Sequence, residues 1–587
     1  MLLLPALFLG AAAAIATAPA GSGGGARLAA AAAPAAARAL TAGSSACDAS
    51  ADVVVWGGTV CGVTASVAAV RSDPAARVLW LVNGTRLGGM TSGGLGGVDL
   101  GMKIGGLADE LLTPLGRGFE PHTAEAAIET MLATAGNKVT TLRRTGWLGS
   151  VATSGSAPRR ITSVTTLTGR TYCGKAFIDC SYEGDLLRLS GTDFAVGRES
   201  QSEYNESLAG KDDAAFDNPT EKPSLFAESV SPFVDPDDPS SPLLPTIVGF
   251  ANESAAGGEA DDWVMSFCFR MCLTTAANNS VAITAPDGYS TASLELLRRE
   301  ITAATHRGLR LSMKSMFLIR ELSDQKIDLN SGQWTAQAGS GGFFPFSTDL
   351  PFAQHGWPLG DAAARARIFA DHKWWTQAML YYLGNDVALR KIQPALATEA
   401  KSYGLCADEY TTEEPTTGNW SPQLYVRESV RLKGARVLTQ QDVCAPAPAP
   451  SSVGISKWGV DVHAMQRLAA KVNGTWRVVN AGGRDSGRYN TVAPKCGNGL
   501  VEVPYEALVP RWDDTSNLLV PVCVSSTHVA FATYRLEAQY AIFGHASGAA
   551  AALALRGGGG AFPVVQAVNM TELQVLLRSQ KQILKAT

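Results

Sequence analysis

The first hydrophobic segment of the chain is a short apolar run that ends in glycines. Residues 53–62 read Val-Val-Val-Trp-Gly-Gly-Thr-Val-Cys-Gly, so a strand is followed by a tight turn and a helix of small residues. A second apolar run, Val78 to Val82, precedes a glycine-rich loop at 87–97, which reads Leu-Gly-Gly-Met-Thr-Ser-Gly-Gly-Leu-Gly-Gly. This order of elements predicts a βαβ unit whose turn and helix N-terminus bind the diphosphate of a dinucleotide.

The rest of the pattern predicts a mixed α/β chain without internal repeats. Apolar residues at helical spacing predict a helix over 121–135. Strands are expected over 159–167 and 171–179, with a hairpin turn between them. The pattern is again helical over 290–325 and 360–400. A stretch rich in Asp, Pro, Ser and Glu between residues 201 and 260 predicts a long surface excursion.

The first glycine turn departs from the usual G-x-G-x-x-G fingerprint. Its three positions are Gly57, Thr59 and Gly62, with Gly58 as an additional glycine, so the middle glycine is displaced. The second strand ends without an Asp or Glu for the ribose hydroxyls, and Asn83 there is a weaker acceptor. A glycine-rich turn in an ordinary α/β domain is the alternative that this segment alone leaves open.

Two later segments allow both a chemical and a structural interpretation. Asp179 ends an apolar run and Glu183 starts a helix, which fits either helix capping or a loop close to the dinucleotide. Residues 517–528 form an apolar run and a polar turn, and they precede a helix whose faces are glycine and alanine. That helix fits either a close approach to a cofactor or tight helix packing through Gly544 and Gly548.

Composition narrows the class without naming a chemistry. The 587 residues are 46% hydrophobic and 17% charged, with a formal net charge of −4. A chain of this length suggests about two to four domains. The charge gives no electrostatic reason to expect nucleic acid or an anionic membrane as a partner. We expect no membrane span in the mature chain.

The N-terminus has the pattern of a targeting segment. Residues 1–18 form an apolar run that ends in Ala-Thr-Ala, which predicts a signal peptide over 1–20 and a low-complexity linker over 21–48. We therefore expect a secreted protein or one in the endomembrane lumen, although the acid-free linker also suits an organelle transit peptide. Seven N-x-S/T sequons predict a glycoprotein: Asn83, Asn205, Asn252, Asn278, Asn419, Asn473 and Asn569.

Ten cysteines fit an oxidising compartment without requiring one. Their even number in a chain with a signal peptide permits disulfides. Cys61, Cys173, Cys180 and Cys523 lie in apolar or glycine-rich runs and are expected to be buried free thiols. The chain has no C-x-x-C pair, and we expect no metal site.

Taken together, the motifs resemble a family of FAD-dependent oxidoreductases. Members carry a GGTxAG turn, an LGGMTSGGLG loop and a FIDATYEGDL strand and loop, and this chain reads GGTVCG, LGGMTSGGLG and FIDCSYEGDL. Further phrases match in the same order, from EPHTAEA to NLLVPVCVSSTHVA, so the resemblance covers about residues 51 to 555. The motifs are also similar to the flavin-binding part of heterodisulfide reductase, whose cysteine cluster this chain lacks.

The resemblance implies which residues bind FAD. The first glycine turn would face the diphosphate, the second loop the flavin ring, and the C-terminal segment the isoalloxazine. The family has Glu where this chain has Val82, which puts recognition of the adenosine ribose in doubt. The cofactor-binding residues expected on this basis are Gly57, Gly58, Thr59, Gly62, Asn83, Gly88, Gly89, Met90, Ser92, Gly93, Gly94, Asp179, Ser181, Glu183, Gly184, Arg535, Gly544 and Gly548.

The sequence evidence for catalytic acid–base groups is weaker than that for FAD binding. His528 and His463 could exchange a proton beside the flavin, and Arg270 or Arg427 could bind a carboxylate or phosphate substrate. A structural role is the alternative for each histidine, and each arginine could instead join two domains.

The sequence thus predicts an α/β protein, with a Rossmann-like (glutathione-reductase-like) FAD-binding domain and an inserted α+β substrate domain. The expected function is flavin-mediated hydride transfer on a small or carbohydrate-like substrate, with an unidentified electron acceptor. Two alternatives are a sugar-active protein similar to xanthan lyases and a degenerate flavin fold that serves as a binding protein. The expected ranges are 49–200 and 511–560 for the FAD-binding domain, 201–510 for the substrate domain and 561–587 for a tail helix.

Overall fold

The computed structural model describes residues 47–99, 102–211, 226–251, 257–332, 344–411, 418–481, 496, 499–557 and 563–586. The predicted signal peptide, almost all of the predicted linker and the sequon at Asn252 lie outside these residues. Residues Cys47–Thr587 belong to one compact unit.

The structural basis of the predicted dinucleotide site is a five-stranded sheet in the order β20-β8-β2-β3-β4. Every neighbouring pair is parallel. Because parallel sheets are covered on both faces, β2, β3 and β8 are buried at every residue. The strands are β2 (Val53–Trp56), β3 (Val78–Leu81), β4 (Val139–Leu142), β8 (Ala176–Asp179) and β20 (Leu518–Leu519). The sheet confirms the predicted α/β, Rossmann-like fold.

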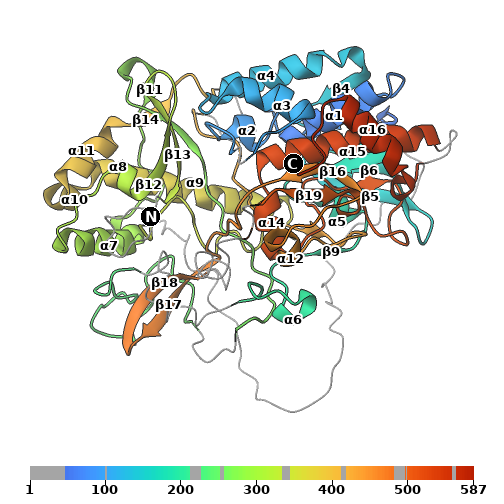
Figure 1. Cartoon of the computed structure of the whole chain (residues 1–587). Helices are drawn as coiled ribbons and strands as arrows, with labels where there is room; N and C mark the ends of the chain where they lie inside the picture. The colour runs from blue at the N-terminus through green and yellow to red at the C-terminus, as the bar shows by residue number, and fades with distance from the viewer. Residues whose placement is uncertain are drawn as a thin grey trace, which may run out of the picture. The chain divides into compact units, whose positions relative to one another are not determined.

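Two helices of this part, α1 (Val60–Ser72) and α15 (Glu537–Gly557), pack side by side (Figure 1). The predicted helices over 121–135 and near the C-terminus are confirmed as α4 and α16. Around the sheet the chain also forms α2 (Met90–Gly93), α3 (Gly106–Leu112), α4 (Pro121–Ala133), α5 (Asp185–Leu189), α14 (His528–Tyr534) and α16 (Met570–Ser579). No helix in the described ranges combines the length and apolar character needed to cross a membrane.

A second sheet contains the predicted hairpin, in the order β1-β7-β6-β5. Its strands are β1 (Ala49–Ser50), β5 (Leu148–Ser154), β6 (Arg160–Thr166) and β7 (Thr171–Cys173). The prediction of one strand over 171–179 is wrong, because the chain leaves this sheet after β7 and enters the parallel sheet as β8. At the break, a Cβ on Gly174 would stand 2.6 Å from Cγ2 of Val54, so a larger residue would not fit beside β2.

The predicted substrate domain contains an antiparallel sheet in the order β11-β14-β10-β13-β12 (Figure 1). The helical prediction for 360–400 is confirmed by α9, α10 and α11. The prediction for 290–325 holds for α7 and α8 but is wrong for β12, where pairing with β13 overrides the local pattern. The elements are β10 (Met271–Thr274), β11 (Ser280–Val281), α7 (Glu295–His306), α8 (Met313–Met316), β12 (Phe317–Glu321), β13 (Lys326–Gly332), α9 (Ala362–Asn385), α10 (Val387–Ile392), α11 (Pro394–Ser402) and β14 (Gly404–Cys406).

Short strand pairs complete the described structure. These pairs are antiparallel: β9 (Phe194–Ala195) with β15 (Arg431–Leu432), β16 (Ser452–Ser456) with β19 (Val501–Pro504), and β17 (Gln466–Val472) with β18 (Thr475–Ala481). Two short helices are α6 (Gln201–Tyr204) and α12 (Gln440–Cys444). β16 packs against α15, since a Cβ on Gly454 would collide with the side chain of Ile542. A strand within the range predicted for the substrate domain, β16, therefore packs on the returning helix α15, and the predicted domain boundaries stay a prediction.

Disulfides join distant parts of the described chain, as Cys47–Cys173, Cys272–Cys406 and Cys444–Cys496. The prediction of a free thiol at Cys173 is wrong, because parallel pairing of β1 with β7 brings Cys47 beside it. The other predicted free thiols are confirmed, and one more is present: Cys61, Cys180 and Cys523, together with Cys268, are buried and unpaired by disulfides.

Candidate functional site

A cavity of about 430 Å³ opens at the carboxyl ends of the parallel strands. The chain runs from β2 to β3 and β4 on one side and places β8 on the other side of β2, so the strand order reverses here. Open α/β sheets bind their ligands at such a reversal. The lining residues are Trp56, Gly57, Gly58, Thr59, Asn83, Gly84, Thr85, Arg86, Gly89, Gly93, Arg144, Gly146, Trp147, Ser181, Tyr182, Glu183, Trp357, Phe369, Pro422, Gln423 and Leu424.

The first glycine turn leaves the N-terminus of α1 open to an anion. Gly57 has φ +108°, and a Cβ there would stand 2.5 Å from the carbonyl carbon of Cys180, so only glycine fits. Thr59 at the N-cap donates its hydroxyl to the carbonyl oxygen of Cys180 at 2.7 Å, and no side chain caps α1. The N–H of Gly62 already donates to the carbonyl oxygen of Thr59 at 3.0 Å, so among the described residues the N–H groups of Val60 and Cys61 are left for a diphosphate. Gly57, Gly58 and Thr59 line the cavity, whereas Gly62 packs behind the turn.

The second glycine loop lies directly against the first. The N–H of Gly88 donates to the carbonyl oxygen of Gly58 at 2.7 Å. Gly89 has φ +57°, and a Cβ there would collide with the hydroxyl of Tyr182. Of the expected residues in this loop, Gly89 and Gly93 line the cavity; Gly88, Met90, Ser92 and Gly94 build the loop without lining it.

The loop after β8 both caps the local backbone and lines the cavity, the two interpretations that the sequence left open. Asp179 is fully buried and accepts hydrogen bonds from the N–H of Ser181 at 3.1 Å and of Leu187 at 2.8 Å, so it caps the local backbone. Burial raises the pKa of Asp179 to about 6 and that of Glu183 to about 7. Ser181 and Glu183 line the cavity, and Gly184 with φ +68° makes the turn between them and α5.

Gly544 and Gly548 lie in the contact between α1 and α15 and do not line the cavity. A Cβ on Gly544 would stand 2.5 Å from the carbonyl oxygen of Cys61, and one on Gly548 would collide with the carbonyl of Ala65. Tight helix packing, the structural alternative for these glycines, therefore accounts for both.

A cluster of charged side chains surrounds His463. Its Nδ1 lies 2.7 Å from Oδ2 of Asp349, and the Arg427 guanidinium lies 2.8 Å from the other oxygen of that carboxylate. On its far side, Nε2 of His463 lies 3.6 Å from Oδ1 of Asp461, which is paired with Arg535 at 3.1 Å. The structure thus brings the predicted residues His463, Arg427 and Arg535 together.

The cluster favours a neutral imidazole beside an ionised carboxylate. Burial lowers the pKa of His463, and the charge of Arg427 lowers it further against the opposing effect of Asp349. Burial would raise the pKa of Asp349, but Arg427 and His463 hold it well below its usual range. The His463 side chain keeps 21% of its surface exposed. This is the arrangement of a general base held by a carboxylate.

The two other catalytic candidates are engaged in structural networks. His528 is buried, with Nδ1 at 2.8 Å from the carboxylate of Glu428 and its backbone N–H donated to Glu199 at 2.8 Å. Arg270 binds Asp328 with both arms, through Nε at 2.9 Å and through a second, shorter contact. Structural roles therefore explain the contacts of His528 and Arg270 in this structure better than proton transfer or substrate binding does.

A sequence profile described as FAD dependent oxidoreductase matches residues 52–577. The chain belongs to this family. Solved structures resemble parts of it: flavin-containing monooxygenase from Stenotrophomonas maltophilia (18% identity, TM-score 0.18, 26% of this chain and 42% of that one), NikD, an unusual amino acid oxidase essential for nikkomycin biosynthesis (18%, 0.18, 26% and 57%), and L-proline dehydrogenase from P. horikoshii (13%, 0.16, 26% and 25%). The chain thus spans less than two thirds of each of these proteins. No curated protein matches the sequence.

FAD is accordingly the cofactor of this oxidoreductase. The uncapped N-terminus of α1, the glycines that a Cβ would block and the cavity at the strand reversal all fit a dinucleotide. When bound, FAD supplies a two-electron acceptor for hydride. The family match favours this activity over the lyase and binding-protein alternatives, and the similarity to the flavin-binding part of heterodisulfide reductase stays a prediction.

Several residues that line the cavity were not predicted from the sequence. Arg144 and Trp147 follow β4, and Trp357 and Phe369 come from the segment before α9 and from α9 itself. None lies in a glycine-rich motif, so no local pattern marks them. One available signal is the crossover after β4, because in this fold it must pass the carboxyl ends of the strands.

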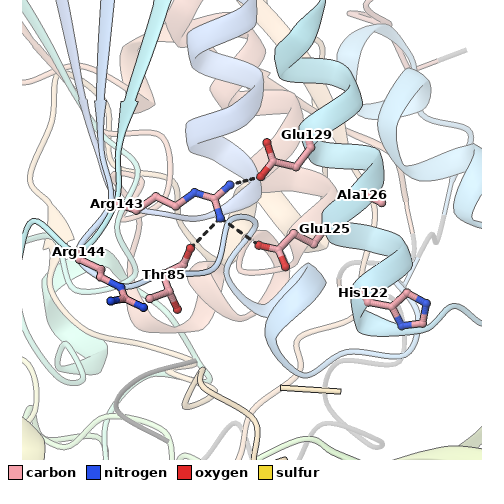
Figure 2. Close-up of a pocket in the computed structure, with 7 residues that line it drawn as sticks. All are labelled: Thr85, His122, Glu125, Ala126, Glu129, Arg143 and Arg144. Atoms are coloured by element: carbon pink, nitrogen blue, oxygen red, sulfur yellow. Dashed lines mark hydrogen bonds and ion pairs between the residues drawn. The ribbon is translucent and has the colours of Figure 1, made fainter. Parts of the chain in front are cut away.

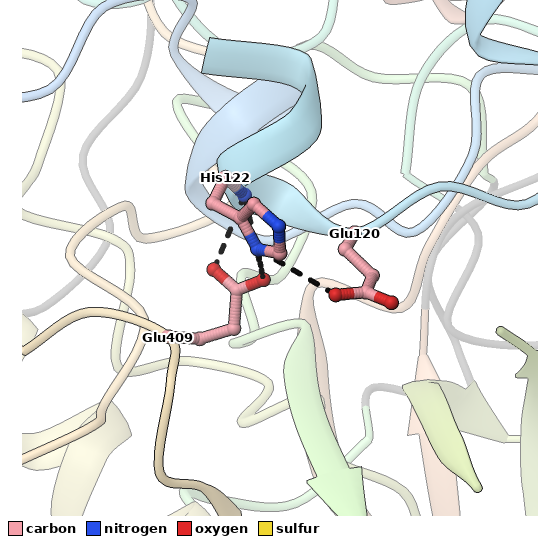
Figure 3. A group of neighbouring side chains, drawn as sticks. All are labelled: Glu120, His122 and Glu409. Atoms are coloured by element: carbon pink, nitrogen blue, oxygen red, sulfur yellow. Dashed lines mark hydrogen bonds and ion pairs between the residues drawn. The ribbon is translucent and has the colours of Figure 1, made fainter. Parts of the chain in front are cut away.

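An ion-pair group links α4 to the loop after β14 (Figure 3). Nδ1 of His122 lies 2.6 Å from the carboxylate of Glu409 and 3.6 Å from that of Glu120. One nitrogen or oxygen atom from each of the three side chains, of the kind that could bind a metal ion, lies within 4.8 Å of the other two. The Lys326 ammonium lies 2.5 Å from Glu120 and compensates its charge. Burial raises the pKa of Glu409. The backbone N–H of His122 also donates to the Glu409 carboxylate at 3.2 Å, so the group joins α4 to the loop after β14 and, through Lys326, to the antiparallel sheet.

Proposed function

We propose that this oxidoreductase oxidises a hydroxyl-bearing small molecule of carbohydrate-like type, with His463 as the general base. The observation that carries the proposal is the Asp349–His463 pair, with Nδ1 and Oδ2 at 2.7 Å. A carboxylate on Nδ1 fixes the tautomer in which Nε2 is the proton acceptor. Nε2 would take the hydroxyl proton, and the same carbon would lose its hydride to bound FAD, which leaves a carbonyl group.

The cluster is connected to the cofactor cavity by short stretches of chain. Leu424 lines the cavity, and the next residue, Tyr425, lies beneath the Arg427 guanidinium at 4.7 Å from ring centroid to Cζ. The Tyr425 hydroxyl also accepts a hydrogen bond of 3.4 Å from the guanidinium of Arg535, a residue that lies just before the start of α15. This continuity supports a substrate position between the cavity and His463.

The groups around His463 suit a neutral, hydroxyl-rich molecule. Asp461 keeps 42% of its side chain exposed and can accept hydrogen bonds from substrate hydroxyls. Its carboxylate also accepts from the indole of Trp458, a residue of the same loop. Because the nearby arginines are already paired with Asp349 and Asp461, little positive charge is left for an anionic substrate.

The experiment is anaerobic reduction of the purified, FAD-loaded protein by a panel of sugar alcohols, aldoses, uronates and amino acids. We expect loss of the visible flavin absorbance with at least one hydroxyl compound. His463→Asn should slow that bleaching about a hundredfold, the usual size of a general-base effect, whereas His306→Asn, on an exposed residue of α7, should leave it unchanged. Bleaching by amino acids alone would overturn the substrate class.

We also propose secretion or residence in the endomembrane lumen. The disulfides support this, because such bonds persist in oxidising compartments. Exposed sequons in the described part of the chain support it independently, and their occupancy can be measured.

A further inference from the structure

The end of β3 lacks the carboxylate that usually recognises the adenosine ribose. Val82 stands there, buried, with Cγ1 only 2.7 Å from the position that a Cβ on Gly58 would take. In dinucleotide-binding folds an Asp or Glu near this position accepts hydrogen bonds from the ribose hydroxyls. A hydrocarbon side chain cannot accept them, so another group must recognise this half of the cofactor.

Arg144 lies in the same part of the cavity wall. The crossover after β4 is tied to the segment after β3: the N–H of Arg144 donates to the carbonyl oxygen of Gly84 at 2.8 Å, and that of Thr145 to Val82 at 3.0 Å. Arg144 has φ +59°, a left-handed conformation that costs free energy for a non-glycine residue. Such conformations persist where the surroundings impose them, often at ligand clamps.

The side chain of Arg144 is uncommitted, unlike those of its cationic neighbours. Figure 2 shows Arg143 held by Glu125, Glu129 and the carbonyl oxygen of Thr85, while Arg144 makes no drawn contact. In the described part of the chain, no ion pair or side-chain hydrogen bond involves Arg144, which is exposed. Arg143 and Arg144 both border a surface groove, but Arg144 alone of the two also lines the cofactor cavity.

Arg86, the other cationic residue that lines the cavity, already has partners within the protein. The Arg86 guanidinium lies 3.3 Å from Glu125 and 3.8 Å from Glu409, and its Nε donates to the carbonyl oxygen of Ser92 at 2.7 Å. It also lies 5.0 Å from the ring centroid of Tyr410. Arg86 therefore stabilises the loop, and Arg144 is the cation available to a ligand.

The geometry points to a replacement: Arg144 recognises the adenosine half of FAD in place of the missing carboxylate. A carboxylate at the strand end accepts from the ribose hydroxyls and repels anions, whereas a guanidinium donates to ribose or phosphate oxygens and attracts anions. The site should therefore tolerate a phosphate on the adenosine 2′ oxygen. This inference rests on FAD as the cofactor.

The first experiment measures FAD binding to protein freed of cofactor, by quenching of flavin fluorescence. Arg144→Ala should weaken FAD binding about tenfold, the size of one charge-assisted hydrogen bond. It should leave riboflavin binding unchanged, because riboflavin lacks the adenosine. Arg143→Ala is the matched control, because this adjacent arginine does not line the cavity and its carboxylate partners Glu125 and Glu129 lie outside it; it should bind FAD within about twofold of the wild type.

The second experiment displaces FAD with ADP and with ADP that carries a 2′-phosphate. We expect the phosphorylated compound to compete at least as well as ADP on the wild type, and Arg144→Ala to lose that tolerance. Equal FAD affinities for the two arginine variants, or rejection of the 2′-phosphate by the wild type, would overturn the inference while leaving the oxidoreductase intact. A wild type that binds no FAD would overturn the proposed function as well.

Discussion

The hydroxyl of Tyr182 donates a hydrogen bond of 2.6 Å to the carboxylate of Glu537. The same hydroxyl accepts from the N–H of Met90 at 2.8 Å, and the other carboxylate oxygen accepts from Thr91 at 2.8 Å. One pair of side chains thus joins the loop after β8, the second glycine loop and the start of α15. The loop after β8 and the second glycine loop both line the cofactor cavity, so the pair fixes their spacing and anchors them to α15.

Removing the Tyr182 hydroxyl should therefore loosen the cofactor site. Tyr182→Phe leaves the N–H of Met90 without its acceptor in a buried place, which costs about 1–3 kcal/mol. We expect a lower melting temperature and weaker FAD retention on gel filtration. Tyr204→Phe is the control, since its hydroxyl makes no hydrogen bond to the described residues. Equal melting temperatures for the two variants would contradict the prediction.

The carboxyl of Glu537 should make stability depend on pH. Burial raises its pKa to about 7, above the value of 4.5 for an unperturbed Glu. Between these values the folded state binds more protons than the unfolded state, so stability falls as pH rises from about 4.5 to 7. Glu537→Gln removes this loss. Its melting temperature relative to the wild type should be higher at pH 8 than at pH 5.

The control for this pH experiment is Glu572→Gln, on the exposed face of α16. Its difference from the wild type should be the same at both pH values. If Glu537→Gln also shows a constant difference, the carboxyl is ionised throughout and the prediction is wrong.

The glycines between α1 and α15 should not accept alanine. Alanine normally stabilises a helix relative to glycine by about 1 kcal/mol. Gly548→Ala should instead destabilise by about 1–3 kcal/mol, because its Cβ would collide with the carbonyl of Ala65. Gly557→Ala at the end of the same helix meets nothing within 4 Å and should be neutral or slightly stabilising. Urea unfolding of the two variants tests the contrast directly.

The proposed secretory location can be tested at the sequons. Asn419 donates its amide to the carbonyl oxygens of Ala407 at 2.9 Å and Glu409 at 2.8 Å, and Asn83 lies in the cavity wall, so neither should carry a glycan. The exposed sequon residues Asn205, Asn278, Asn473 and Asn569 should carry one. Enzymatic deglycosylation in heavy-oxygen water and peptide mass spectrometry identify each site. Glycan at Asn419 would contradict the described contacts, and none anywhere would contradict secretion.

The parts of the site that the sequence predicted are those fixed by local backbone chemistry. Gly57 and Gly89 both adopt positive φ, and Gly57, Gly58 and Thr59 line the cavity because strand, turn and helix are contiguous. Such a turn depends on a few neighbouring residues, so its role follows from the motif alone. Gly548 shows the limit of the same signal, since a small residue suits a cofactor and a neighbouring helix equally well.

The parts that the sequence could not predict depend on long-range contacts. His463 was one of several histidines until the fold placed Asp349, 114 residues earlier, against its ring. Trp147 and Trp357 form a pair with ring centroids 6.4 Å apart, although they belong to different predicted domains. Neither contact leaves a periodic pattern in the sequence, because periodicity reports which face is buried and not what covers it.

Asp349 should set both the pKa and the tautomer of the proposed base. Asp349→Asn keeps the shape of the side chain and removes the charge that raises the pKa of His463 against burial and Arg427. The pKa of His463 should therefore fall further, and the acid limb of the pH profile for flavin reduction should move to lower pH. The rate above that limb should drop about tenfold to a hundredfold, because the tautomer is no longer fixed.

A merely structural role for Asp349 would not move the pH limb. Because the substitution also leaves Arg427 beside a neutral amide, FAD content and melting temperature must first show that the variant folds. Asp371→Asn, on an exposed position of α9, provides the control and should keep both the rate and the limb. A folded Asp349→Asn protein with the wild-type profile would show that His463 is not the base, and a slower protein with an unmoved limb would assign Asp349 to packing alone.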